Sequence, residues 1–224
     1  MATVITQDDL IESVAAALQY ISYYHPADYI QHLARAYEAE QSPAAKDAIA
    51  QILTNSRMCA EGKRPICQDT GIVNVFLKIG MGVRFEGFTG TVTDAVNEGV
   101  RRAYNFADNK LRASIVADPH FERKNTKDNT PAVVHMELVE GDTIDVKLAA
   151  KGGGSENKTK FVMLNPSDSL VDWVLKTFIN ARAYDEKTLL AQTGIHMVFL
   201  VSALAIAYSD RIMAQTAIAD RNQH

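Results

Sequence analysis

The most chemically suggestive segment of the chain is Arg64-Pro65-Ile66-Cys67-Gln68-Asp69-Thr70-Gly71, which directly precedes an apolar run. A thiolate in such a turn can ligate a soft or borderline metal, including iron in a sulfide cluster. Asp69 could exchange protons with a substrate, and Gln68 could hydrogen-bond to a polar one. A buried structural cysteine beside ordinary turn residues fits the same pattern, so both interpretations stay open here. Cys59 matches no C-x-x-C spacing, and we expect it to be structural.

A second segment, Lys151-Gly152-Gly153-Gly154-Ser155-Glu156-Asn157-Lys158-Thr159-Lys160, follows an expected strand. Consecutive glycines let backbone N–H groups converge on an anion, and the lysines add positive charge. The spacing matches neither the Walker A pattern nor the G-x-G-x-x-G dinucleotide pattern. It favours anion binding, with a flexible glycine turn as the alternative.

Other polar segments carry weaker signals. The run Arg123–Pro131 has mixed charge and is interpreted mostly as a solvated connection. The six histidines form no His-x-x-x-His pair, so a zinc hydrolase has no support.

Composition excludes several classes of protein. The 224 residues are 47% hydrophobic, which excludes a disordered chain, and two cysteines cannot build a disulfide scaffold. A formal net charge of -4 argues against a dedicated nucleic-acid binder. The first residues carry no basic leader, and the longest apolar run, Ile195–Tyr208, is shorter than the roughly 20 residues that cross a bilayer. We therefore expect a cytoplasmic protein with no membrane or nucleic-acid partner.

Helices are expected to lead into a sheet. Apolar residues at helical spacing follow Thr6 and Asp9, which fit a capping pair. His25-Pro26 interrupts that pattern, a second helix follows, and Ser42-Pro43 predicts the start of a third. Further helices are expected over 92–104 and after Ser167-Asp168-Ser169.

Three segments are expected to be strands. The run 72–79 reads as a largely buried strand, and 133–138 and 144–148 flank Glu140-Gly141-Asp142 as a predicted hairpin. Helices followed by a mixed sheet indicate an α+β or mixed α/β domain.

Four segments together resemble the N-terminal part of the class I fumarate hydratases, the oxygen-sensitive iron–sulfur hydro-lyases. The resemblance runs from about residue 5 to Thr177. The related tartrate dehydratases share the cysteine loop. The segments are Cys67-Gln68-Asp69-Thr70-Gly71, Leu111-Arg112-Ala113-Ser114, Lys127-Asp128-Asn129-Thr130-Pro131-Ala132 and Lys151-Gly152-Gly153-Gly154-Ser155-Glu156-Asn157-Lys158.

The resemblance implies roles for these residues. Cys67 would be the first ligand of a [4Fe–4S] cluster that the family holds with three cysteines, its open iron acting as a Lewis acid on malate or fumarate. Asp69 would be catalytic and, with Gln68, would contact substrate, while Arg112 would grip a carboxylate. Further implied substrate contacts are Gly154, Asn157, Lys158, Thr159, Lys160, Phe161, Val162 and Met163. The family also implies a homodimer acting on fumarate, malate or a similar small dicarboxylate.

The resemblance stops after Thr177. The family continues there into a glycine-rich segment with its second cluster cysteine, whereas this chain has no cysteine beyond Cys67. We therefore expect residues 1–177 to be an incomplete iron–sulfur hydro-lyase N-terminal domain. Residues 178–224 would be a divergent tail of a truncated or frame-altered product, partly helical over 195–213.

Three functions follow from these features. The expected function is fumarate hydratase, with activity in the intact enzyme rather than in this chain alone. The alternatives are a tartrate dehydratase-like subunit that gains its missing ligands from a partner chain, and a non-catalytic anion-binding fragment.

Overall fold

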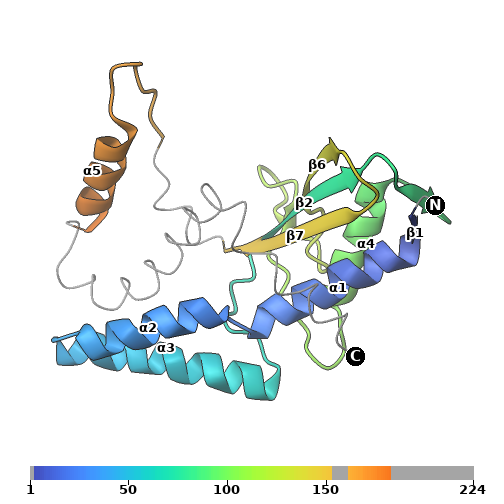
Figure 1. Cartoon of the computed structure of the whole chain (residues 1–224). Coiled ribbons are helices and arrows are strands. Elements are labelled where there is room, and N and C mark those ends of the chain that lie inside the picture. The colour runs from blue at the N-terminus through green and yellow to red at the C-terminus, as the bar shows by residue number, and fades with distance from the viewer. Residues whose placement is uncertain (1–2, 153–160, 183–224) are drawn as a thin grey trace.

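A computed structural model describes residues 3–152 and 161–182 of the chain and confirms an α+β fold (Figure 1). A short strand and three helices come first, and strands and helices then alternate irregularly. The elements in chain order are β1 (Val4–Thr6), α1 (Gln7–Tyr23), α2 (Ala27–Ala39), α3 (Pro43–Gly62), β2 (Ile72–Gly80), β3 (Arg84–Glu86), α4 (Val92–Tyr104), β4 (Val116–Ala117), β5 (Lys124–Asn125), β6 (Val133–Val139), β7 (Ile144–Lys151) and α5 (Leu170–Arg182).

Local signals in the sequence correctly predict where three of the helices begin. The Thr6 side chain accepts a hydrogen bond from the Asp9 N–H, and the Asp9 carboxylate accepts one from the Thr6 N–H, which completes the predicted capping box of α1. Pro43 opens α3 as predicted, although the Ser42 side chain makes no capping hydrogen bond. Ser169 caps α5 by accepting from the Asp172 N–H at 3.2 Å.

The central sheet has the order β6-β2-β7, so the predicted hairpin of the last two strands is wrong. Strand β2 lies between them, parallel to β6 and antiparallel to β7. The connection 140–143 crosses the end of β2, where Gly80 N–H donates to Thr143 O and Gly82 N–H donates to Gly141 O. A Cβ on Gly80 would lie 2.6 Å from Gly141 O, so the crossing depends on a glycine there. The most apolar strand therefore takes the central position, with hydrogen bonds on both edges.

One hydrophobic core holds the sheet to two helices. Alternate residues of β2 point to the same face and pack with α1 and α4. Gly99 of α4 allows these helices to approach closely, because a Cβ there would lie 2.7 Å from the Val14 Cβ. The largest fully buried side chains of this core are Tyr104, Ile11, Leu18, Leu77, Val14, Val73, Val75, Val96 and Val100.

Helices α2 and α3 lie side by side and project from the sheet (Figure 1). No residue of α2 is buried, whereas Ser56 and Cys59 of α3 are. Within the two described ranges, none of the helices combines the length and the apolar character needed to span a bilayer.

Substituting Gly99 with alanine tests the contact between α1 and α4. Glycine to alanine in an exposed helix stabilises it by about 1 kcal/mol. Here we expect the opposite sign, a loss of about 1–3 kcal/mol in the free energy of unfolding, because the new methyl group overpacks against Val14. Urea denaturation measures the change, and Glu12→Ala on the exposed face of α1 serves as the control. A stabilised Gly99→Ala chain would contradict this packing.

Candidate active site

The backbone that leads to Cys67 is fixed by two helices. Helix α3 is followed by Lys63 in the left-handed region (φ 48°), which turns the chain back. Ile66 N–H then donates to the Ser22 carbonyl of α1 at 2.8 Å, and Asn55 Nδ2 of α3 donates to the Ile66 carbonyl at 3.1 Å. Cys67 therefore enters its turn from a position set by the ends of α1 and α3.

The Cys67 thiol lies half-buried within its own turn. Its Sγ accepts a hydrogen bond from the Asp69 N–H at 3.4 Å and lies 3.6 Å from Gln68 Oε1. Gln68 is exposed and Asp69 half-buried. The Cys67 sulfur therefore accepts from the backbone of its own turn and faces the Gln68 amide oxygen, to which its thiol can donate.

Tyr104 of α4 supports the same turn from the core. Its hydroxyl donates to the Thr70 carbonyl at 3.4 Å, and its ring is 1% exposed. Burial raises the pKa of Tyr104, and the nearby negative charge of Asp69 raises it further. Tyr104 therefore stays protonated and keeps donating to the turn.

Asn129 joins the cysteine turn to the Arg112 segment. Its side chain is fully buried at 0% exposure. Its Oδ1 accepts from the Ser114 and Ile115 N–H groups at 2.6 and 3.2 Å, and its Nδ2 donates to the Gly71 carbonyl at 3.0 Å. Asn129 has a φ of 60°, a conformation that asparagine adopts more readily than most residues.

A second contact reinforces this junction. The Thr70 hydroxyl donates to the Arg112 carbonyl. The Arg112 side chain is exposed, while its neighbour Leu111 is buried in the core. The Thr70–Gly71 end of the cysteine turn therefore lies beside the backbone of Arg112 and of the residues that follow it.

The start of the glycine-rich segment reaches the same place. Gly71 has a φ of 62°, and a Cβ on it would lie 1.6 Å from the Lys151 carbonyl oxygen and 2.6 Å from the Gly152 Cα. Only glycine permits this approach. The structure thus brings together the cysteine turn, the Arg112 segment and the entrance to the glycine-rich segment.

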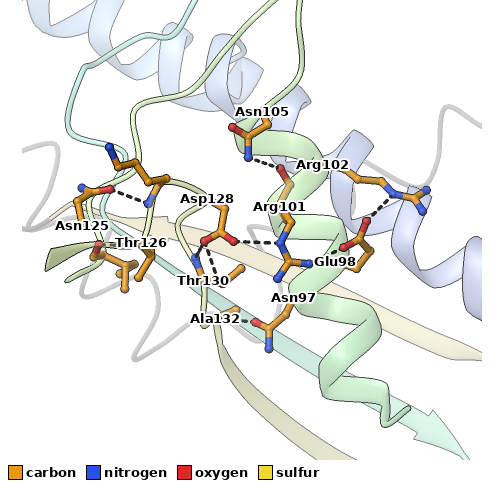
Figure 2. A network of polar contacts seen from close by, with 12 residues as sticks. Asn97, Glu98, Arg101, Arg102, Asn105, Asn125, Thr126, Asp128, Thr130 and Ala132 are labelled. Carbon is orange, nitrogen blue, oxygen red and sulfur yellow. Dashed lines mark hydrogen bonds and ion pairs between the residues drawn. The ribbon is translucent and has the colours of Figure 1, made fainter. Parts of the chain in front are cut away.

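An ion-pair network holds the Asn129 loop to α4 (Figure 2). Arg101 Nε lies 3.0 Å from the Asp128 carboxylate and also pairs with Glu98, while Asp128 accepts from the Thr130 N–H and hydroxyl. Burial of Asp128 opposes its charge, but the hydrogen bonds from Thr130 and Arg101 prevail and lower the pKa of Asp128. Asn97 of α4 also accepts from the Ala132 N–H at 2.9 Å.

The polar run Arg123–Pro131 is therefore only partly a solvated connection. Residues 123–127 are mostly exposed, but the prediction is wrong for 128–130, where Asn129 is buried and its neighbours half-buried. The structural roles of Asn129, Tyr104 and Arg101 were not predicted from the sequence. The sequence did contain a signal, the pair Asp128-Asn129. Asp and Asn tolerate the left-handed backbone region, and their side chains hydrogen-bond to nearby backbone groups.

The remaining predicted site residues divide into two groups. Gly154, Asn157, Lys158, Thr159 and Lys160 lie outside the described residues. Phe161, Val162 and Met163 are described and are exposed, at 84, 37 and 80%.

The donor set does not fit a complete [4Fe–4S] cluster held by three cysteines. The chain has two cysteines, and Cys59 is buried in α3 with its Sγ 3.5 Å from the Pro65 carbonyl oxygen and 3.6 Å from Asn55 Oδ1. Burial raises the pKa of Cys59 and so disfavours its thiolate. Residues 3–152 and 161–182 contain no cluster of three His, Cys, Asp or Glu side chains that could hold a metal ion. Of the two cysteines, Cys59 is buried and Cys67 is half-buried.

Comparison with known proteins decides the family. A sequence model described as "Fumarate hydratase (Fumerase)" matches residues 11–184, more than half of the chain. The chain belongs to the fumarate hydratase (Fumerase) family. The match covers the cysteine turn, Arg112, Asn129 and the glycine-rich segment, so the junction described above is built from residues within the family region.

Two kinds of proteins are similar to this member of the fumarate hydratase family. It is 32% identical over 166 residues to a putative L(+)-tartrate dehydratase subunit alpha of Methanocaldococcus jannaschii, covering 70% of this chain and 56% of the relative. It is 35% identical over 134 residues to the anaerobic class I fumarate hydratase of Escherichia coli K12, covering 60% of this chain and 24% of the relative. It is 28% identical over 171 residues to an L(+)-tartrate dehydratase subunit alpha of Escherichia coli UTI89, covering 76% of this chain and 55% of the relative.

The chain spans about half the length of the tartrate dehydratase alpha subunits it matches and about a quarter of the fumarate hydratase. The helix α5 runs through Thr177 to Arg182, and the family match ends at residue 184. The boundary between the domain of residues 1–177 and a divergent tail stays a prediction.

Removing the Asn129 side chain tests the junction between the two segments. We expect Asn129→Ala to lower the free energy of unfolding by about 2–4 kcal/mol, because buried donors and an acceptor lose their partners. Asn125→Ala is the matched control, since Asn125 lies at the end of the nearby strand β5, also bonds to backbone and is exposed. We expect that control to cost about 1 kcal/mol or less in urea denaturation. Equal losses for the two variants would contradict a special role for Asn129.

Two glycines with similar positive φ values test the close approach of Gly71 to Lys151. Gly71 and Gly87 have φ values of 62° and 72°, but only at Gly87 is there no atom within 4 Å of a new Cβ. Gly87→Ala should cost about 1–2 kcal/mol from backbone strain alone. Gly71→Ala should exceed that loss by at least about 2 kcal/mol, because the methyl group collides with backbone. Similar melting temperatures for the two variants would refute the close approach.

Proposed function

We propose that this chain supplies part of the active site of a hydro-lyase that adds water to, or removes it from, a small dicarboxylate. The observation that supports the proposal is the junction at Asn129, which joins the Gly71 end of the cysteine turn to the segment that follows Arg112, together with the Thr70 hydroxyl that donates to the Arg112 carbonyl. Family membership supports it, since the matched relatives are named fumarate hydratases and tartrate dehydratase alpha subunits.

In this proposal each residue has a distinct role. Arg112 binds one carboxylate of the substrate, because a guanidinium matches a carboxylate in shape and charge. Asp69 exchanges a proton with the substrate or with water, and Gln68 orients a polar substrate group. The anion-binding role of Gly154, Asn157, Lys158, Thr159, Lys160, Phe161, Val162 and Met163 belongs to the same proposal.

The proposed site is incomplete within this chain. Cys67 would act as one ligand of an iron–sulfur cluster, and further thiolates would have to come from another polypeptide. When bound, such a cluster supplies a Lewis acid. The share of the relatives that this chain does not cover is the natural source of the missing groups. A cytoplasmic location and a dimeric assembly are part of the proposal.

Two substrates have comparable support. Fumarate, hydrated to malate, is favoured by the family description and by the class I fumarate hydratases among the relatives. Tartrate, dehydrated to oxaloacetate, is favoured by the share of this chain that aligns. The alpha subunits of tartrate dehydratase match 70–76% of this chain, and the anaerobic fumarate hydratase matches 60%. A subunit that requires a partner also agrees with the incomplete donor set.

Complementation tests the proposal. The full chain is co-produced with a polypeptide spanning the part of the Methanocaldococcus jannaschii relative beyond the match, and is reconstituted with iron and sulfide without oxygen. We expect the pair to consume fumarate or L(+)-tartrate, and neither polypeptide to do so alone.

Matched variants assign the residues in the same assay. Cys67→Ser should abolish turnover, whereas Cys59→Ser should retain it. Arg112→Lys should lower kcat/KM by roughly 10- to 100-fold through loss of a charge-assisted hydrogen bond, and Arg123→Lys on the exposed loop should not. If no complement gives turnover with either substrate, the catalytic proposal fails. Fumarate binding by the isolated chain would then support an anion-binding fragment.

A further inference from the structure

Asn109 makes a second set of buried amide contacts, on the segment that precedes Arg112. It lies in the irregular stretch between α4 and β4 and is 4% exposed. Its Nδ2 donates to Gln19 Oε1 of α1 at 2.9 Å, and Gln19 Nε2 donates back to the Asn109 carbonyl at 3.0 Å. The two amides therefore join α1 to a segment 90 positions further along the chain.

Two neighbouring groups extend this pair. Gln19 Nε2 also donates to the Ala103 carbonyl near the end of α4 at 2.7 Å, and Asn109 Nδ2 also donates to Ser22 Oγ at 3.2 Å. The Ser22 hydroxyl in turn donates to the Gln19 carbonyl at 2.7 Å. Both acceptors of Gln19 Nε2 are carbonyl oxygens, so only the amino side of the amide fits there. Buried amides that are paired in this way favour one arrangement of the backbones that they join.

The same face of α1 holds the backbone that leads to Cys67. Ser22 lies three residues after Gln19, so the two side chains share one face of the helix. The Ser22 carbonyl accepts from the Ile66 N–H at 2.8 Å, and Ile66 directly precedes Cys67. One helix face is therefore attached both to the Asn109 segment and to the entrance of the cysteine turn.

A direct contact also joins these two segments. Arg64, three residues before Cys67, donates from Nη1 to the Asp108 carbonyl at 2.6 Å, next to Asn109. Arg112 follows Asn109 by three residues. The segment that leads to Cys67 and the segment that leads to Arg112 therefore hold to each other and to α1.

We propose that Gln19 and Asn109 form a positioning pair for the proposed site, setting the backbone before Cys67 relative to the backbone before Arg112. This inference rests on the proposed function, because it takes Cys67 and Arg112 as site residues. The pair acts through the backbone, since Asn109 is buried. Without it both site residues remain, but their spacing is no longer fixed, and a misplacement of about 1 Å in an active site costs roughly 100-fold in rate.

Hydrogen exchange in the full chain tests the pair without any turnover. We expect Asn109→Ala to raise the exchange rate of the Ile66 amide by about 10- to 100-fold, because buried groups lose their partners and the local opening becomes easier. Val96→Ala truncates a fully buried core side chain of α4 and serves as the control for lost global stability. It should leave Ile66 exchange unchanged, as should Asn105→Ala, an exposed asparagine that bonds to a carbonyl. Equal effects of Asn109→Ala and Val96→Ala on Ile66, or none from Asn109→Ala, overturn the proposal.

Gln19→Glu gives a readout that a role in packing alone would not move. A protonated carboxyl accepts from Asn109 and donates to one carbonyl, whereas a carboxylate sets negative charge against two carbonyl oxygens. Burial raises the pKa of a carboxyl. Relative to the native chain at the same pH, we therefore expect Ile66 protection close to native at about pH 5 and at least about 10-fold lower at about pH 8. Gln19→Met, which has no donor, should show the loss at both values. A ratio for Gln19→Glu that does not change with pH overturns the proposal.

Turnover of the complemented enzyme separates this inference from the proposed function. There Asn109→Ala should lower kcat/KM by roughly 10- to 100-fold through misplacement of the site, and Asn105→Ala should not. Unchanged turnover in Asn109→Ala overturns the positioning role. Absence of turnover in the native pair counts against the proposed function instead, and the exchange measurements then decide whether Gln19 and Asn109 set the two backbones.

Discussion

The site of this chain depends on one buried amide. Asn129 accepts from two backbone N–H groups beyond Arg112 and donates to the carbonyl of Gly71, and a buried polar group of this kind is stabilising only when it is paired. Arg101 holds the adjacent Asp128 to α4, and α4 packs on α1 and on the sheet. The hydrophobic core thereby positions the cysteine turn through a short series of polar contacts. These contacts hold the cysteine turn in place although it contains no helix or strand.

The same constraint explains why glycine and cysteine occur where they do. Gly71 lies against the Lys151 backbone and leaves room for no side chain. Cys67, four residues earlier, lies outside this close packing and remains half-buried, while Cys59 is enclosed in α3. The two cysteines of this chain therefore differ in their surroundings: Cys67 is half-buried in a turn, and Cys59 is buried in a helix. The family region fixes the backbone beside Cys67 and Arg112, and the proposed enzyme requires more thiols than this chain contains.

Local features of the fold were predictable and long-range ones were not. The capping box of Thr6 and Asp9 and the helix over 92–104 follow from residues within a few positions of each other. The order of the strands does not, because the segments on either side of Gly141 look like a hairpin until β2 is placed between them. Burial of Asn129 likewise depends on partners 58 and 15 positions away. The cysteine turn was identified from its residue types and Arg112 by resemblance, whereas the residues that hold them together become apparent only in three dimensions.

Hydrogen exchange at the Ser114 and Ile115 amides is the most direct measurement of whether Asn129 organises this site. Both amides lie outside any helix or strand. The account predicts that they exchange at least about 100-fold more slowly than exposed loop amides, as an opening free energy of a few kcal/mol requires. It also predicts that Asn129→Ala removes that protection while the β2 amides keep theirs. Fast exchange in the native chain, or protection unchanged by Asn129→Ala, would contradict it.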